Sequence, residues 1–320
     1  MPLSMGRLVR AGLVPLLAGW AVMACSAQGD PTQHCVAANA RPVASAFAEI
    51  WIPDQVVTLG SEIHPEEAPR ANAHIDGFWI DVFETTNADF ERFVDATGYV
   101  TFAERDSAGG AVFENGQWHL DPTATWRTPF GAHGPRAEPD KPVVQVTHED
   151  ALAYARWRGR DLPTEAEWEA AARGGVAGAE YAWGSSSRLE GGLPGANHWQ
   201  GLFPVQNTNE DGFPTIAPVG CFPPNPYGLY DITGNVWELT KDLWGLRPGA
   251  DAAAAAPLTE SAPVGAHTIK GGSWLCADNF CRRYRPAARQ AADPYMGTNH
   301  IGFRTVRRPP MAIREGFGGY

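Results

Sequence analysis

Hydrophobic and polar positions form two kinds of pattern in the first half of the chain. Trp51–Leu59 and Ala73–Val82 are rich in β-branched and aromatic residues, a composition typical of strands. In three later segments the apolar residues recur at helical spacing. Each of these segments starts at a threonine that is followed three positions later by an acidic residue, as in a helix N-cap or capping box.

The three predicted helices begin after Thr86, Thr147 and Thr164. Gly98 ends the first helix and Gly174-Gly175 stop the third, because glycine accepts the left-handed conformation that closes a helix. The rest of the chain shows only short strands and long turns. Residues 249–263 contain five consecutive alanines and are interpreted as a surface excursion.

Composition extends this picture to the whole chain. The 320 residues include 35 glycines, 27 prolines and 12 tryptophans, which suits irregular segments packed by large rings rather than a helical bundle. No internal repeat is visible. We therefore predict a single α+β domain that is rich in loops and low in regular secondary structure.

The first residues form an export signal. Arg7 and Arg10 precede the apolar run Ala11–Ala24, which is too short to span a bilayer comfortably. Two interpretations remain open: Cys25 is lipidated after cleavage, because Val22–Cys25 is similar to a lipoprotein signal, or cleavage follows Ala27. The mature chain is then either a lipoprotein on the periplasmic face of a bacterial membrane or a secreted protein.

The domain boundaries follow from this interpretation. We predict a signal at 1–27, a tether at 28–48, the folded domain at 49–310 and a C-terminal tail at 311–320. Export permits disulfides, and pairing of Cys35 with Cys221 stays open. The net charge of −11 and the lack of a basic stripe argue against a nucleic-acid partner, and a membrane contact is expected only through lipid on Cys25.

The sharpest chemical signal is a pair of cysteines, Cys276 and Cys281, between the turn Gly271–Ser273 and the basic run Arg282–Arg285. Arginines close to the sulfurs would favour thiolates. Two thiolates without a histidine form a soft site, of the kind that selects Cu(I), whereas zinc requires four ligands. On spacing alone, a structural disulfide is the favoured interpretation.

Longer motifs between Val56 and Arg307 carry a resemblance to a known family. They are Gly60-Ser61, Phe78–Asp81, Glu84–Asn87, Phe90–Val94, Pro142–Thr147, Gly159–Glu169, Arg173–Gly175, Tyr227–Glu238, Gly271–Ser273 and Gly302–Arg304. Together they resemble the aerobic formylglycine-generating enzymes, also called sulfatase-modifying factors. The resemblance implies a mixed α+β fold related to C-type lectins, and oxidation of a cysteine in a sulfatase Cys-x-Pro-x-Arg motif to formylglycine.

The resemblance also implies a site. Cys276 and Cys281 would hold Cu(I), with the substrate thiolate as a third ligand, and Ser273 and Trp237 would line the pocket. The expected partners are a sulfatase polypeptide, O2 and an external reductant. A peptide held by extended backbone contacts suits an open groove on a single-domain monomer.

Two calcium sites are implied by the same resemblance, since Ca2+ takes carboxylate, amide and backbone oxygens. The first uses Asn197, His198, Asp211 and Phe213. The second uses Asp231, Gly234, Val236 and Glu238. Without the resemblance, both segments are interpreted as turns.

The chain departs from the family pattern in two places. Animal members of the family have two structural disulfides. The matching positions in this chain are Ala155 with Thr305 and Ala172 with Pro286, so both cysteines of each bridge are absent. A histidine, His300, stands where an asparagine near the active site is expected. The missing disulfides suggest a bacterial type of family member, whose fold is stabilised by packing and calcium instead.

Two competing interpretations keep the fold and drop the chemistry. The first is a non-catalytic, lipid-anchored member that acts as a structural or ligand-binding protein. The second is a lectin-like module with a Cys276–Cys281 disulfide. Retention of both cysteines favours the enzyme over the first, and free thiols would argue against the second.

Overall fold

The computed structural model describes residues 48–245 and 262–310, all within one compact unit, Pro31–Tyr320. The predicted signal, nearly all of the tether, most of the alanine-containing excursion and the tail fall outside the described residues. No helix in the described part is long and apolar enough to cross a membrane.

The first two predicted strands are each divided in two. Trp51–Leu59 separates into β1 (Glu49–Ile52) and β2 (Gln55–Leu59), and Ala73–Val82 into β3 (Ala71–Ile75) and β4 (Phe78–Asp81). The first break falls at Pro53, which has no backbone N–H for a ladder. β1 pairs antiparallel with β4, and β2 with β3. The prediction of two continuous strands was therefore wrong, while their extended character is confirmed.

The three predicted helices are present and begin where the threonines indicate. They are α2 (Asn87–Thr97), α3 (His148–Trp157) and α4 (Glu165–Ala172). Thr86, Thr147 and Thr164 each form a capping box with the acidic residue three positions on. Gly98 ends α2 at φ 66°, which is the left-handed region that favours glycine.

The remaining elements are short. They are η3 (Pro65–Glu67), η4 (Phe102–Ser107), β5 (Gly110–Glu114), β6 (Gln117–Asp121), η5 (Glu190–Gly192), β7 (Gly201–Leu202), β8 (Gln206–Asn207), β9 (Trp237–Leu243), β10 (His267–Lys270), β11 (Arg289–Ala292), β12 (Gly297–Thr298), β13 (Ile301–Gly302) and β14 (Val306–Arg307). Among the described residues after α4, the only helical element is η5. The predicted loop-rich α+β fold is confirmed.

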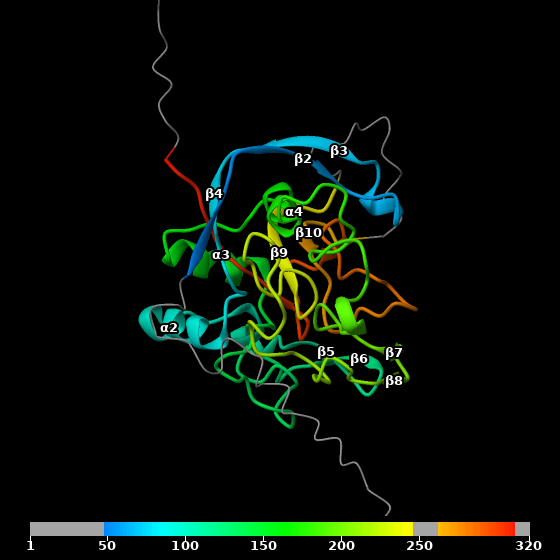
Figure 1. Cartoon of the computed structure of the whole chain (residues 1–320). Helices are drawn as coiled ribbons and strands as arrows, with labels where there is room; N and C mark the ends of the chain where they lie inside the picture. The colour runs from blue at the N-terminus through cyan, green and yellow to red at the C-terminus, as the bar shows by residue number, and fades with distance from the viewer. Residues whose placement is uncertain (1–47, 246–261, 311–320) are drawn as a thin grey trace, which may run out of the picture. The chain divides into compact units, whose positions relative to one another are not determined.

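A four-stranded sheet in the order β11-β10-β9-β13 lies at the centre of Figure 1. β9, β10 and β11 are antiparallel, and β13 runs parallel to β9 with Ile301 opposite Trp237. α4 and the β2–β3 hairpin lie on one side of this sheet in the view, and β5–β6 with β7–β8 on the other. The chain leaves β10 directly into the segment that carries both cysteines.

Charged groups are buried between α4 and the central sheet. Glu165 and Glu169 of α4 are almost fully buried. Lys270 Nζ lies 3.0 Å from Glu169 Oε2 and 3.5 Å from Glu165 Oε1, and Arg173 Nη2 lies 2.6 Å from Glu169 Oε1. Burial alone would raise the pKa of Glu169, but Lys270 and Arg173 outweigh it and lower that pKa to about 2.

Candidate functional site

The cysteine loop begins at two glycines with positive φ. Gly271 (φ 93°) follows β10, and Gly272 (φ 75°) approaches the returning chain so closely that a Cβ would lie 2.5 Å from the Arg283 carbonyl oxygen. Only glycine fits such a contact. The two ends of the loop therefore meet, and the residues between them form a closed excursion from the sheet.

Local hydrogen bonds bring the two cysteines together. The Cys276 N–H donates to the Ser273 carbonyl at 2.9 Å, and the N–H groups of Cys281 and Arg282 both donate to the Ala277 carbonyl, at 3.2 and 3.0 Å. Arg282 takes φ 47°, which tightens this turn. The loop thus folds back within five residues, so that the second sulfur faces the first.

Both cysteines are free thiols, and the Cys276 thiol donates a hydrogen bond to the sulfur of Cys281. Cys276 is only 2% exposed, whereas Cys281 is partly exposed. The disulfide interpretation is not the state seen here. The predicted convergence of the two sulfurs is present.

The two thiols differ in acidity. Burial, followed by the hydrogen bond to Cys281, raises the pKa of Cys276. The hydrogen bond from Cys276 lowers the pKa of Cys281 to about 7 against the effect of burial, with help from the backbone N–H and the charge of Arg283. Of the three arginines expected to act, Arg282 instead pairs with Glu180 at 2.9 Å and Arg285 with Glu67 at 2.6 Å.

The other two predicted catalytic residues lie in the surrounding core. Ser273 is fully buried, and its Oγ accepts the Leu275 N–H at 3.3 Å. Trp237 on β9 is 2% exposed and packs in the same apolar cluster as Cys276. Both shape the walls around the thiols.

His300 lies beside the aromatic ring of Trp118, with centroids 5.0 Å apart. Its Nδ1 is 2.7 Å from Thr298 Oγ1, and burial lowers its pKa to about 3. The histidine that replaces the expected asparagine is therefore a neutral ring at physiological pH.

The residues of the first predicted calcium site lie close together. Asp211 Oδ2 accepts the His198 N–H at 3.1 Å, and its Oδ1 accepts the Phe213 N–H at 2.9 Å. Burial raises the pKa of Asp211 to about 6. The side-chain oxygen of Asn197 is buried and has no hydrogen-bond donor.

Sequence reasoning missed Gln200 at this site. Its amide Nε2 donates to Asp211 Oδ2 at 2.7 Å and to the His198 carbonyl, so a donor group occupies the space between the predicted calcium ligands. A buried carboxylate without a cation and a buried amide oxygen without a donor fit a hard cation. Only the alternation of polar residues near Asn197 could have indicated Gln200.

In the second predicted calcium set, the carboxylate of Glu238 is in contact with an arginine. Both carboxylate oxygens of Glu238 accept hydrogen bonds from Arg304 Nε, at 2.9 and 2.8 Å, and Trp168 Nε1 donates at 2.8 Å. Gly234 and Val236 use their N–H groups, the first to the Gly271 carbonyl at 2.9 Å and the second to Glu84 Oε1 at 3.3 Å. Glu238 forms an ion pair with Arg304 in this structure, and its role as a calcium ligand stays a prediction.

Negative charge is nevertheless in excess near the second set. Glu84 is buried, and burial together with Asp231 and Glu238 raises its pKa well above the ordinary value. Arg304 is the cation that faces these groups. Glu84 belongs to the Glu84–Asn87 motif, but the position of its carboxylate beside Asp231 and Glu238 was not predicted from the sequence.

The loop and the first calcium segment are directly connected. The Trp199 N–H donates to the Cys276 carbonyl at 3.1 Å, and the His198 ring stacks on Tyr284 with centroids 4.1 Å apart. Asn197 Nδ2 also donates to Asn235 Oδ1 at 3.0 Å. Any group that orders Asn197–Trp199 therefore also restrains the thiols.

Aromatic rings lead from the thiols to a large pocket. Phe280, which is 67% exposed, stacks on Phe203 at 4.5 Å, and Phe203 stacks on Phe113 at 5.5 Å. Phe113 and Trp274 line a pocket of about 720 Å3 between the β5–β6 turn and the β7–β8 hairpin. The site thus has an apolar surface beside it.

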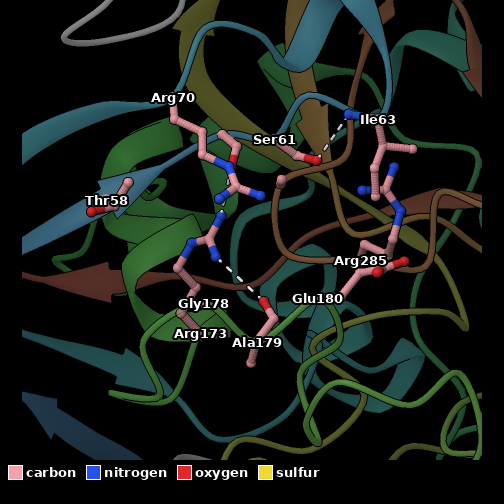
Figure 2. Close-up of a pocket in the computed structure, with 11 residues that line it drawn as sticks. Thr58, Ser61, Ile63, Arg70, Arg173, Gly178, Ala179, Glu180 and Arg285 are labelled. Carbon is pink, nitrogen blue, oxygen red and sulfur yellow. Dashed lines mark hydrogen bonds between the residues drawn. The ribbon is translucent and has the colours of Figure 1, made fainter.

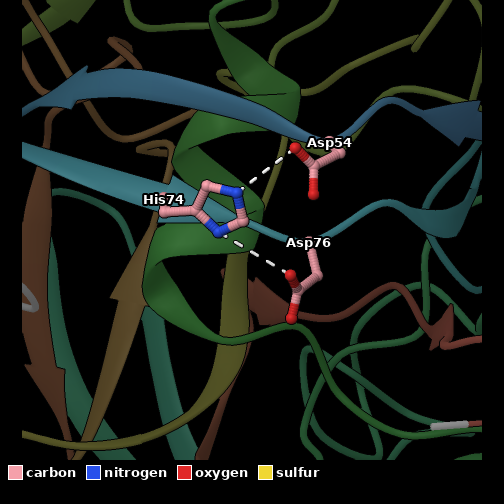
Figure 3. A group of neighbouring side chains, drawn as sticks. All are labelled: Asp54, His74 and Asp76. Atoms are coloured by element: carbon pink, nitrogen blue, oxygen red, sulfur yellow. Dashed lines mark hydrogen bonds and ion pairs between the residues drawn. The ribbon is translucent and has the colours of Figure 1, made fainter. Parts of the chain in front are cut away.

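A separate cluster of possible ligands lies on the β2–β3 hairpin. Figure 3 shows the His74 ring between the carboxylates of Asp54 and Asp76, with Nε2–Oδ1 and Nδ1–Oδ1 distances of 3.2 and 3.7 Å. All three residues are exposed. Each ring nitrogen already faces a carboxylate, so the cluster is an exposed ion-pair group.

The fold and the site define an α+β domain that carries a free dithiol beside an aromatic pocket. Residues 35–309 match the family described as "Sulfatase-modifying factor enzyme 1-like domain". The chain is 43% identical over 291 residues to the formylglycine-generating enzyme of Mycobacterium tuberculosis, a match covering 81% of this chain and 97% of that one. The chain therefore belongs to the sulfatase-modifying factor family.

Two further comparisons limit what membership of this family implies about activity. The chain is 37% identical to the inactive Cα-formylglycine-generating enzyme 2 of Mus musculus, over 74% of this chain and 77% of that one. PvdO from Pseudomonas aeruginosa has the same fold, with a TM-score of 0.61, 24% identity and coverage of 82% and 94%. The family thus includes a member named as inactive, and activity has to be argued from the site.

Proposed function

We propose that this protein oxidises a cysteine of a sulfatase polypeptide to formylglycine, with Cu(I) held by Cys276 and Cys281. The observation that carries the proposal is the pair of free, mutually hydrogen-bonded thiols in a chain that is 43% identical to a formylglycine-generating enzyme. Two sulfurs without a nitrogen ligand suit a soft monovalent ion. When bound, such an ion would supply the redox chemistry with O2.

The reaction needs an external reductant. The substrate CH2–SH group and O2, with two electrons and two protons from a donor thiol pair, give an aldehyde, hydrogen sulfide and water. The donor thiols become a disulfide. The protein orients the substrate sulfur toward the partly exposed Cys281, while the buried Cys276 anchors the other side of the site.

The aromatic surface suits an extended substrate peptide. A Cys-x-Pro-x-Arg segment spans about 13 Å from its cysteine to its arginine when extended. We expect the residues beside its cysteine to contact Phe280, the neighbour of Cys281 in the sequence, and Phe203, on which Phe280 stacks. The pocket lined by Phe113 and Trp274 offers an apolar volume for one of them. Glu114 at the same pocket provides a carboxylate for the peptide arginine.

The test is conversion of a synthetic Cys-x-Pro-x-Arg peptide by the purified full chain with Cu(I), O2 and a thiol reductant. Mass spectrometry follows the loss of sulfur, and an aldehyde-reactive probe identifies the product. We expect conversion by the native protein, and none when a Cu(I) chelator is present. A peptide with serine in place of cysteine is the substrate control.

Cys276→Ser and Cys281→Ser are expected to lower activity by a hundredfold or more and to abolish one-to-one Cu(I) binding. Thr298→Ser, at a residue whose Oγ1 contacts His300, is the control and is expected to keep Cu(I) binding. Aldehyde formation that persists in both serine variants would contradict the proposal. So would a native protein that binds Cu(I) but forms no aldehyde with any reductant, because it would then be a non-catalytic family member.

We further propose that the protein is exported, anchored through lipid on Cys25 or secreted. Cys221 is a disulfide cysteine, which supports an oxidising compartment; Cys35, the partner considered, lies outside the described residues. Membrane fractionation of native protein and Cys25→Ala tests the anchor, and release by the variant alone is expected for a lipoprotein. Equal release of both forms would indicate simple secretion.

A further inference from the structure

A second, small pocket of about 120 Å3 is lined by the end of β2, the residues before β3, the loop after α4 and the segment that follows the cysteine loop. Figure 2 shows its lining side chains. Three of them are arginines, Arg70, Arg173 and Arg285. Like-charged side chains seldom share so small a space unless anions balance them.

Two of these arginines are fixed from behind by buried carboxylates. Arg173 Nε and Nη2 lie 3.1 and 2.6 Å from Glu169 Oε1, and Nη2 donates to the Gly60 carbonyl at 3.0 Å. Arg285 forms a two-pronged pair with Glu67, at 3.0 and 2.6 Å. Their guanidinium groups are therefore held rigidly at the pocket.

The carboxylates are shared among more cations than they can neutralise. Glu169 faces Lys270 as well as Arg173, and Glu165 faces both Lys270 and Arg289. The acidic residue that lines the pocket, Glu180, pairs with Arg282 at 2.9 Å. The lining of the cavity therefore carries three arginines and one carboxylate, that of Glu180.

Arg70 differs from the other two lining arginines in its partners. Its backbone N–H donates to Glu62 Oε1 at 3.1 Å, but its guanidinium has no ion pair with any carboxylate in the described part of the chain. In Figure 2 its side chain extends from one wall of the pocket toward Arg173 on the other. The residue is exposed, so a ligand can reach it from solvent.

We propose that this pocket binds one small oxyanion of the phosphate or sulfate class, held between Arg70 and Arg173. The guanidinium of Arg70 presents two parallel N–H groups that match the oxygens of such an anion. Arg173 directs Nε and Nη2 at Glu169 and Gly60, so it contributes its charge and an Nη1 hydrogen. The small volume suits a single small anion better than a nucleotide. The site is separate from the thiol pair, and its existence does not depend on the proposed oxidase activity.

Isothermal titration of the full chain with phosphate and with sulfate, at constant ionic strength set by NaCl, tests the proposal. We expect one saturable site per chain. Arg70→Gln is expected to weaken the affinity about tenfold or more, since it removes a charge-assisted pair of hydrogen bonds. Arg70→Lys keeps the positive charge but lacks the two parallel N–H groups. Its affinity for phosphate is expected to lie between those of the native protein and Arg70→Gln.

Arg156→Gln is the matched control, because Arg156 is an exposed arginine on the last turn of α3. It is expected to bind phosphate within twofold of the native protein. Thermal unfolding of both glutamine variants checks that they are folded. Saturable binding that is equal in Arg70→Gln and native protein overturns the proposal, and so does the lack of any binding above that of chloride.

A second titration, with phosphoserine, separates the two sources of this chemistry. Binding of inorganic phosphate but not of phosphoserine supports a free ion as the ligand. Equal binding of both supports a phosphoryl group carried on a larger molecule. In either case the loss in Arg70→Gln must be the same for the site to be the one described.

Discussion

Residues near the thiols differ in effect according to where their side chains point. Arg283 acts on Cys281 through its backbone N–H and its charge, while the guanidinium of Arg285 lies against Glu67. Nearness along the chain is therefore a poor guide to electrostatic influence, because the field of a charge depends on distance and on what already pairs with it. Cys281 is the more acidic thiol chiefly because it accepts the hydrogen bond from Cys276, and Arg283 adds to this effect.

His300 allows a direct test at the residue scale. Burial lowers its pKa to about 3 in the folded protein, against about 6.5 in the unfolded chain. The unfolded state therefore binds the proton first, and stability present above pH 6.5 is lost as the pH falls from 6.5 toward 3. We expect His300→Asn to remove about 2 kcal/mol of this loss at pH 5.

Urea unfolding of native protein and His300→Asn from pH 4 to pH 8 measures this effect. His133→Asn, at an exposed histidine, is the control and is expected to follow the native pH dependence. Parallel curves for native protein and His300→Asn would show that this ring is not buried in its neutral form.

At the scale of elements, α4 is held to the central sheet by charges as well as by apolar contacts. Its inward face carries Glu165 and Glu169, and β10 presents Lys270, whose side chain is fully buried. A buried ion pair adds little stability compared with apolar residues in the same place. Removal of one partner, however, leaves the other as a buried charge with less compensation, which is destabilising. The same helix ends at Arg173, which lines the small arginine pocket.

We expect Lys270→Met to lower the free energy of unfolding by about 2 kcal/mol, because Glu165 and Glu169 each lose one of the two buried cations that face them and keep only Arg289 and Arg173. Lys241→Met is the matched control on β9: its ion pair with Asp161 spans 2.6 Å, but its side chain is 54% exposed. That variant is expected to lose less than about 1 kcal/mol. Chemical denaturation of both measures the difference, and equal losses would contradict a buried role for Lys270.

Across the whole domain, the cysteine loop depends on segments far away in sequence. Trp199 donates to the Cys276 carbonyl, and the Trp274 N–H donates to the Asn235 carbonyl at 2.9 Å. The loop itself contains little regular structure, so these contacts hold the sulfurs in position. A calcium ion at Asn197 and Asp211 would stiffen one of these supports.

We therefore expect Ca2+ to raise the unfolding temperature, by an amount that corresponds to about 2.7 kcal/mol at a hundred times its Kd. Asp211→Asn is expected to abolish this shift, because it removes the buried carboxylate. Asp76→Asn, in the exposed His74 cluster, is the matched control and keeps the shift. A calcium response that survives in Asp211→Asn would place the ion elsewhere.

Local sequence determined much of the secondary structure and the location of the site. Capping boxes at Thr86, Thr147 and Thr164 act within one turn, so the helix starts could be predicted from neighbouring residues. The cysteine pair could be recognised for the same reason, since its loop closes on itself. Pro53 also indicates the break between β1 and β2, because it lacks a backbone N–H, although the residue pattern predicted a continuous strand there.

Only the tertiary structure decided how distant charges and amides are used. Glu238 meets Arg304, Glu169 meets Lys270, and Gln200 enters the predicted calcium site. Each contact joins side chains whose meeting depends on how separate elements pack, and spacing along the chain contains no such information. The partnership of each carboxylate with a cation or an N–H group is settled by which elements the fold brings together.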